Sequence, residues 1–89
     1  MKQVRVVISG TVQGVSFRYF LQEQANILHV TGWARNTQDG NVEALFQGDE
    51  NAVGRMIRRC FRGPTSATVA HVTFDEANEP IYQDFVVKN

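Results

Sequence analysis

The chain has 89 residues, of which 43% are hydrophobic, and its nine basic and nine acidic side chains give a formal net charge of zero. This length and composition predict one small domain over residues 1–89 with an apolar core. A zero net charge disfavours nucleic acid and anionic membranes as partners, because proteins that bind either usually carry a basic excess.

Two further features bear on where the protein works. No apolar run approaches the roughly 20 residues needed to span a bilayer, and the first residues pass directly into a strand pattern without a signal peptide. The only cysteine, Cys60, cannot form an internal disulfide. We therefore expect a soluble cytoplasmic protein.

The first third of the chain predicts a strand, a loop and a helix. Residues 3–10 are rich in β-branched side chains that alternate along the chain, which is typical of a strand. Residues 17–28 repeat apolar side chains at helical spacing. The inward face of that helix carries Phe17, Leu21, Ala25 and Leu28. Residues 11–16 form the loop between the two elements.

The next two segments predict a β-hairpin. Residues 30–37 and 41–48 read as strands, and the Asp39-Gly40 pair between them is a strong hairpin signal. We expect the two strands to lie antiparallel, joined by a tight turn.

A second helix is expected after Asp49, which is a suitable N-cap. Its apolar stripe is formed by Val53, Met56, Ile57 and Cys60. This spacing places Cys60 in the core, as a small packing residue rather than a nucleophile. Gly63-Pro64 ends the helix, since glycine favours a helix C-terminus and proline cannot continue it.

The last third of the chain predicts two strands, at residues 68–75 and 81–87. The uneven apolar spacing of the first of these indicates a β-bulge or a change of face. The whole order is βαββαβ with an added C-terminal strand. Two right-handed β-α-β crossovers place both helices on one face of an antiparallel sheet, which is the ferredoxin-like α+β layout.

The stretch from Gly10 to Arg18 is the candidate functional motif. A strand-to-helix loop with two glycines can turn several backbone N–H groups toward one point, beside the positive end of a helix dipole. That arrangement binds an anion, and Arg18 adds a permanently charged fork suited to phosphate or carboxylate. It is not a Walker A loop, because Gly10 and Gly14 are too close and no Lys-Ser/Thr pair follows. From the residues alone, a tight turn with a solvated Arg18 remains open.

Residues 10–18 read Gly-x-Val-Gln-Gly-Val-x-Phe-Arg, which resembles the signature loop of the acylphosphatase family. Residues 32–37, Gly-Trp-Ala-Arg-Asn-Thr, and residues 39–43, Asp-Gly-Asn-Val-Glu, are similar to a second family segment. Further similarities are Gly63-Pro64 with Ala67 and Val69, and Asp84-Phe85. The resemblance covers nearly the whole chain.

The resemblance implies hydrolysis of a carboxyl-phosphate bond to a carboxylate and inorganic phosphate, by direct attack of a positioned water. It implies a small acyl phosphate as substrate, inorganic phosphate or sulfate as competing anions, and no metal or other cofactor. Arg18 would bind the phosphoryl oxygens, and Asn36 would hold the water. The other substrate-binding residues would be Gln13, Gly14, Val15, Ser16, Phe17 and Thr37. Taken alone, Asn36 also fits a residue that starts the hairpin turn.

The chain departs from the family pattern at two positions. Ser16 stands where the commonest family form has glycine, which leaves open how flexible the loop is. His29 stands where a glycine commonly ends the first helix. If the backbone at His29 is left-handed, that residue carries a modest strain, which histidine tolerates better than most.

Two alternatives to an enzyme remain from the sequence. One is a non-catalytic module that binds phosphate or carbamoyl phosphate, like the acylphosphatase-type domain of the hydrogenase-maturation carbamoyltransferases. The other is an RNA-recognition domain, which shares the βαββαβ order. The strand at 41–48 lacks the aromatic pattern by which such domains stack bases. Metal binding has little support, since His29, His71 and Cys60 are isolated.

Overall fold

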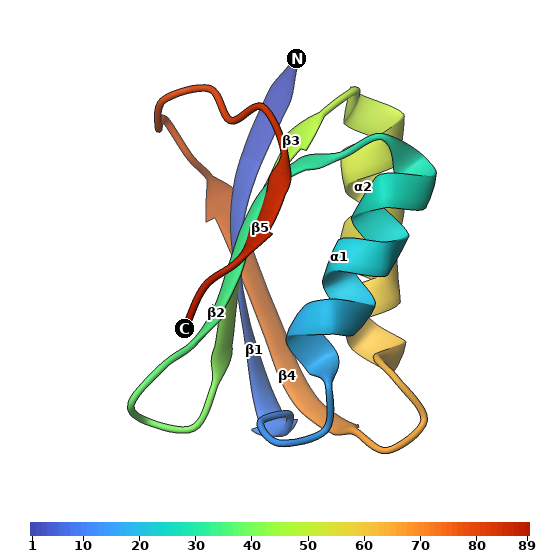
Figure 1. The fold of residues 1–89 in the computed structure, drawn as a ribbon, viewed down its shortest axis with the longest axis vertical. Helices are drawn as coiled ribbons and strands as arrows, with labels where there is room; N and C mark the ends of the chain where they lie inside the picture. Colours follow the sequence, from blue (N-terminus) through green and yellow to red (C-terminus); the bar gives the residue numbers. More distant parts are fainter.

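The computed structural model describes residues 1–89, and it places two helices on one face of a five-stranded sheet (Figure 1). The elements are β1 (Lys2–Thr11), α1 (Phe17–Leu28), β2 (Thr31–Asn36), β3 (Val42–Gly48), α2 (Glu50–Arg62), β4 (Thr68–Glu76) and β5 (Phe85–Val87). The strand order is β4-β1-β3-β2-β5. The first four strands pair antiparallel and β5 runs parallel to β2, so the complete sheet is mixed. The predicted ferredoxin-like layout is confirmed.

The core lies between the helices and the sheet. Alternate residues of the central strand β1, Val4, Val6 and Ile8, are buried toward the helices, as the period of two predicts. The helices meet them with Leu21 and Met56, both fully buried. Cys60 belongs to the same cluster, and its burial raises the pKa of the thiol well above the usual value. Cys60 is therefore confirmed as a core residue.

The ends of α2 follow the predicted capping. The Asp49 carboxylate accepts a hydrogen bond from the Asn51 N–H at 3.1 Å, and Gly63 ends the helix with a φ of 67°. A side chain on Gly63 would meet the ring of Phe17 at 2.5 Å, so the end of α2 packs directly on the start of α1. Neither helix is long and apolar enough to cross a membrane.

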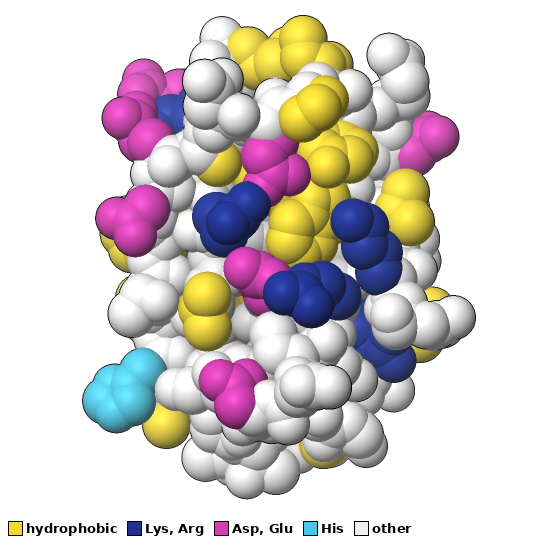
Figure 2. Space-filling view, turned by 90° about the vertical axis from the view of Figure 1, so that its left-hand side faces the viewer, with side chains coloured by type: hydrophobic (Ala, Val, Ile, Leu, Met, Phe, Trp, Pro, Cys, Tyr) yellow, Lys and Arg dark blue, Asp and Glu magenta, His cyan; other side chains and the backbone are white.

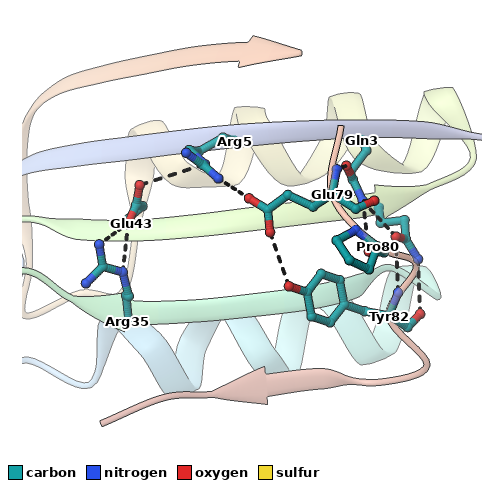
Figure 3. Close-up of polar contacts among 8 residues, drawn as sticks. Gln3, Arg5, Arg35, Glu43, Glu79, Pro80 and Tyr82 are labelled. Carbon is teal, nitrogen blue, oxygen red and sulfur yellow. Dashed lines mark hydrogen bonds and ion pairs between the residues drawn. The ribbon is translucent and has the colours of Figure 1, made fainter. Parts of the chain in front are cut away.

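The predicted strand over 81–87 is wrong in its first half, because β5 covers only Phe85–Val87. Residues 77–84 instead cross the face of the sheet opposite the helices (Figures 1 and 3). Two glutamines of the sheet hold this segment. The Glu79 N–H donates to Gln3 Oε1 at 2.6 Å, and Gln47 Nε2 donates to the Tyr82 carbonyl at 3.0 Å. These side chains satisfy backbone groups that a strand ladder would otherwise have to pair.

Charged side chains on this outer face pair with one another (Figures 2 and 3). Glu43 lies between Arg35 and Arg5, and Arg5 also reaches Glu79. Burial raises the pKa of Glu79, but hydrogen bonds from Arg5 and Tyr82 act more strongly in sum and hold that pKa below its usual value. The arginine side chains of these pairs are 46–47% exposed, which limits the stability that each pair contributes.

The only tryptophan, Trp33, lies beneath this covered face and is 5% exposed. Lys88 Nζ lies 4.5 Å from the centre of its ring. An RNA-recognition sheet needs exposed aromatic rings on which bases can stack. Because Trp33 is covered, it cannot serve as a stacking platform for bases on the outer face of this sheet.

The bulge expected from the uneven spacing of residues 68–75 is confirmed. Ser9 pairs with His71 but Gly10 pairs with Val69, so Ala70 is the extra residue of β4. Gly10 has a φ of 126°, and a side chain there would lie 2.2 Å from the Thr68 carbonyl oxygen. Only glycine fits this approach, which brings the end of β1 close to the edge strand.

His29 ends α1 in the left-handed conformation, with φ 59° and ψ 41°. The N–H of His29 donates to the Ala25 carbonyl, and the N–H of Val30 donates to the same oxygen at 2.8 Å. This is the geometry in which a helix usually has glycine. The strain anticipated for a histidine at this position is therefore present.

We predict that His29→Gly stabilises the protein by up to about 1 kcal/mol, because it relieves the left-handed strain. The larger entropy of an unfolded glycine chain limits the gain. The measurement is the midpoint of denaturant unfolding. Glu23→Gly, an exposed position within the same helix, is the control and should lose about 1 kcal/mol. A fall in the midpoint of His29→Gly would contradict the prediction.

Candidate active site

The loop between β1 and α1 presents backbone amides that no other part of the chain uses. Gly14 and Ser16 are both left-handed, with φ values of 74° and 62°. Ten backbone hydrogen bonds lie in turns, loops and caps, and the backbone amides of residues 12–19 donate none of them. Left-handed residues within a turn bend successive N–H groups toward one side, and this turn opens directly into α1. The loop can therefore donate several hydrogen bonds to one anion, beside the positive end of the helix.

A hollow of about 270 Å³ lies at this loop. Its walls are Val12, Gly14, Ser16, Phe17, Arg18, Tyr19 and Asn36. The fold thus brings Asn36, from the end of β2, to the same hollow as the loop and Arg18. A larger hollow of about 800 Å³ lies at the other end of β1, around Lys2 and Glu50, and includes none of the predicted site residues. The smaller hollow is the one that combines an anion cradle with a fixed positive charge.

Arg18 is held by the C-terminal end of the chain. Its Nη1 donates to the Lys88 carbonyl at 2.6 Å, and the Lys88 N–H donates to the Ala34 carbonyl at 2.8 Å. A guanidinium has several further N–H donors, so this contact leaves others to face the hollow. Nothing in the sequence around Lys88 indicated this role, because the contact joins residues 70 positions apart.

Asn36 is the last residue of β2 and pairs with Val42 of β3. Its side-chain amide makes no hydrogen bond to another protein group, although the residue is only partly exposed. A hairpin-starting asparagine usually bonds its own turn. Asn36 instead keeps both its donor and its acceptor free at the hollow.

Gln13 and Thr37 are placed where the loop meets the hairpin, outside the walls of the hollow. Gln13 Nε2 donates to the carbonyls of Thr37 and Asn41, at 2.7 and 2.8 Å. The Thr37 hydroxyl donates to Asp39 and accepts from the Asn41 N–H at 3.1 Å. The Gln13 side chain therefore fastens the loop to the hairpin that carries Asn36, whereas the Thr37 side chain holds the hairpin turn together.

The remaining predicted residues also divide into those that line the hollow and one that does not. Gly14, Ser16 and Phe17 line the hollow, with the Phe17 ring itself buried in the core. Val15 does not line it; it packs against the core, and its carbonyl accepts a hydrogen bond from Ser66 at 3.2 Å. The prediction from sequence did not include Tyr19, which lines the hollow with a side chain that is 58% exposed.

The electrostatics of the hollow are simple. Arg18 is its only charged wall residue, and no aspartate, glutamate, histidine or cysteine lines it. In the whole structure, no group of three such residues is placed to hold a metal ion. The site is therefore suited to hold an anion and a neutral water, and its walls include no group that takes a proton at neutral pH.

A sequence model described as Acylphosphatase matches residues 4–87. An acylphosphatase of Rubrobacter xylanophilus is 49% identical over 75 residues, which are 84% of this chain and 68% of that protein. An acylphosphatase of Thermotoga petrophila is 40% identical over 88 residues, 99% of this chain and 98% of that protein. The crystal structure of acylphosphatase from Bacillus subtilis superposes with a TM-score of 0.94 at 33% identity and covers all of both chains.

We predict that Gln13→Ala weakens phosphate binding and lowers the free energy of unfolding by about 1–3 kcal/mol, because two carbonyls lose their donor and the loop loses its anchor. Phosphate titration and denaturant unfolding measure the two effects. Gln22→Ala is the matched control, since Gln22, which lies on α1 and not in the loop, donates one side-chain hydrogen bond to the Phe85 carbonyl. It should lose stability but keep phosphate affinity. Equal phosphate affinity in both variants would show that the Gln13 side chain does not shape the loop.

Proposed function

This chain belongs to the acylphosphatase family, whose activity is the hydrolysis of acyl phosphates, and we propose that its active site is the hollow between the β1–α1 loop and Asn36. One observation carries the proposal. The unpaired loop amides, the guanidinium of Arg18 and the unpaired amide of Asn36 converge on one small space.

In the bound state, the phosphoryl group occupies the loop. The amides of residues 13–17 donate to its oxygens, and Arg18 adds charge-assisted hydrogen bonds from one side. Because the Lys88 carbonyl already holds one edge of the guanidinium, Arg18 loses less side-chain freedom when it binds the substrate. The same donors stabilise the negative charge as it spreads over the oxygens in the transition state.

Asn36 holds the attacking water. The water oxygen forms a bond to phosphorus while the bond from phosphorus to the acyl oxygen breaks, and the electron pair leaves with the carboxylate. A carboxylate is a weak base, so its departure needs no general acid. The walls offer no base for the proton of the water, and we assign that proton to a phosphoryl oxygen. The products are a carboxylate and inorganic phosphate.

The two alternatives to an enzyme, an RNA-recognition domain and a non-catalytic binding module, gain no support. The covered Trp33 and the paired outer face of the sheet do not suit a domain that stacks RNA bases. Acylphosphatases similar over nearly the full chain favour an enzyme over a non-catalytic binding module. We also propose a cytoplasmic location, which the lone and buried cysteine supports.

We predict that the protein releases phosphate from an aryl acyl phosphate in the presence of a metal chelator, because its anion site is built from amides and an arginine. Inorganic phosphate and sulfate should inhibit competitively, since both resemble the group that the loop holds. Steady-state rates at several inhibitor concentrations measure this. Loss of activity with chelator and recovery with zinc or magnesium would contradict the mechanism, and non-competitive inhibition would place the anion site elsewhere.

We predict that substitutions at Arg18 and Asn36 both lower turnover but differ in their effect on phosphate affinity. Arg18→Ala should lose nearly all turnover and bind inorganic phosphate weakly, because Arg18 contacts phosphate in both the ground state and the transition state. Arg18→Lys should restore little, since a point charge cannot reproduce the fork. Asn36→Ala should lower kcat by roughly a hundredfold or more while phosphate affinity changes little, the pattern of a contact used in the transition state.

Turnover and phosphate titration on the same folded samples separate these roles. Arg35→Ala is the matched control, because Arg35 precedes Asn36 but pairs with Glu43 on the outer face. It should keep both turnover and phosphate affinity. Full turnover in folded Asn36→Ala, or a loss of phosphate affinity as large as that of Arg18→Ala, would overturn the division of roles.

A further inference from the structure

We propose that Tyr19 binds the acyl group of the substrate and makes the enzyme prefer acyl phosphates whose acyl group is flat and aromatic. This inference rests on the proposed active site, and it names the part of the substrate that the loop, Arg18 and Asn36 leave without a partner. Tyr19 is here a specificity-determining residue rather than part of the phosphate cradle.

The hollow offers apolar surface at one place only. Val12 and Phe17 line it, but each is 1% exposed, so their side chains belong to the core. Gly14, Ser16, Arg18 and Asn36 contribute polar groups or backbone. The Tyr19 side chain, 58% exposed, is the one wall that can take an apolar group out of water.

Tyr19 is also in the right place along the substrate. The Arg18 guanidinium lies over the Tyr19 ring, with the guanidinium carbon 5.9 Å from the ring centre, and in the proposed site this guanidinium holds the phosphoryl group. In an acyl phosphate a single bridging oxygen separates the phosphorus from the acyl carbon. An acyl group attached to a phosphoryl group at Arg18 therefore emerges beside the phenol ring.

In-line displacement directs the acyl group the same way. The attacking water and the leaving oxygen lie on opposite sides of phosphorus. Asn36, which holds the water, comes from the sheet, whereas Tyr19 comes from the first turn of α1 in the helix layer. A leaving group that points away from Asn36 points toward the helix layer, where Tyr19 stands.

The expected effect is a selectivity between acyl groups. An aromatic acyl group can meet the edge of the phenol ring or stack on the face that Arg18 does not cover, whereas an acetyl group has no ring to offer. Such aromatic pairs favour binding by roughly two- to tenfold beyond simple area burial. Contacts with a non-reacting part of the substrate raise kcat/KM when they persist in the transition state.

The experiment measures kcat/KM for benzoyl phosphate and acetyl phosphate, and the affinity for inorganic phosphate, in the wild type, Tyr19→Ala and Tyr19→Phe. Comparing the benzoyl-to-acetyl ratio between variants removes the intrinsic difference in reactivity of the two substrates. The ratio should fall roughly two- to tenfold in Tyr19→Ala and stay near the wild-type value in Tyr19→Phe. Phosphate affinity should be unchanged in both.

Phe61→Ala is the matched control, because Phe61 is an equally exposed aromatic, 56%, that lies on α2 and does not line the hollow. It should leave the ratio unchanged. A wild-type ratio in an active Tyr19→Ala overturns the inference while the proposed function stands. Equal losses on both substrates with weakened phosphate binding also overturn it, because Tyr19 would then position Arg18. A wild type that hydrolyses neither substrate refutes the proposed function itself.

Discussion

The unpaired amides of the β1–α1 loop are the constraint on which the rest of the structure depends. Several N–H groups that face one point repel one another, and an anion that accepts hydrogen bonds from them relieves this repulsion. The loop keeps this shape because its surroundings fix it. Gly10 lets β1 approach the bulged edge strand, Gln13 fastens the loop to the hairpin, and Phe17 packs onto Gly63 at the end of α2. The two-layer core therefore holds the amides in place before any anion arrives, and binding needs little reorganisation.

If the hollow is the active site, as we propose, its charge decides which phosphate compounds it can hydrolyse. One guanidinium and a set of backbone dipoles stabilise an anion, but the walls contain no carboxylate or imidazole that could move a proton. An alkyl phosphate ester needs an acid to protonate its alkoxide, whereas an acyl phosphate releases a carboxylate that is stable near neutral pH. The family activity thus follows from what the hollow lacks as well as from what it holds. Among the wall residues of this proposed site, Tyr19 is the only one with an exposed apolar side chain, which is why we propose it as the contact for the acyl group.

Local patterns in the sequence predicted the features that local forces determine. Alternation gave β1, helical spacing gave both helices, and glycines with a following arginine located the loop. The segment before β5 was mispredicted as strand because its backbone is satisfied by Gln3 and Gln47, whose contacts span 76 and 35 positions. For the same reason, the sequence did not predict the hydrogen bond between Arg18 and the Lys88 carbonyl, or the bonds by which Gln13 anchors the loop. A side chain that bonds to distant backbone leaves no periodic signal, so these contacts become visible only in three dimensions.

The two non-glycine residues with positive φ lie at the two ends of α1, and their contexts differ in kind. At His29 the left-handed turn only ends the helix, so its strain lowers the stability of the fold and contributes nothing to binding. At Ser16 the same conformation shapes the amide cradle, and the position has an exposed side chain beside the hollow. A glycine there, as in the commonest family form, would remove the strain but would also widen the range of conformations open to the loop. Serine restricts the unfolded and unbound loop more than glycine does, at the cost of some strain. The chain thus departs from glycine at both ends of one helix, and only at the loop end can the departure contribute to preorganising the site.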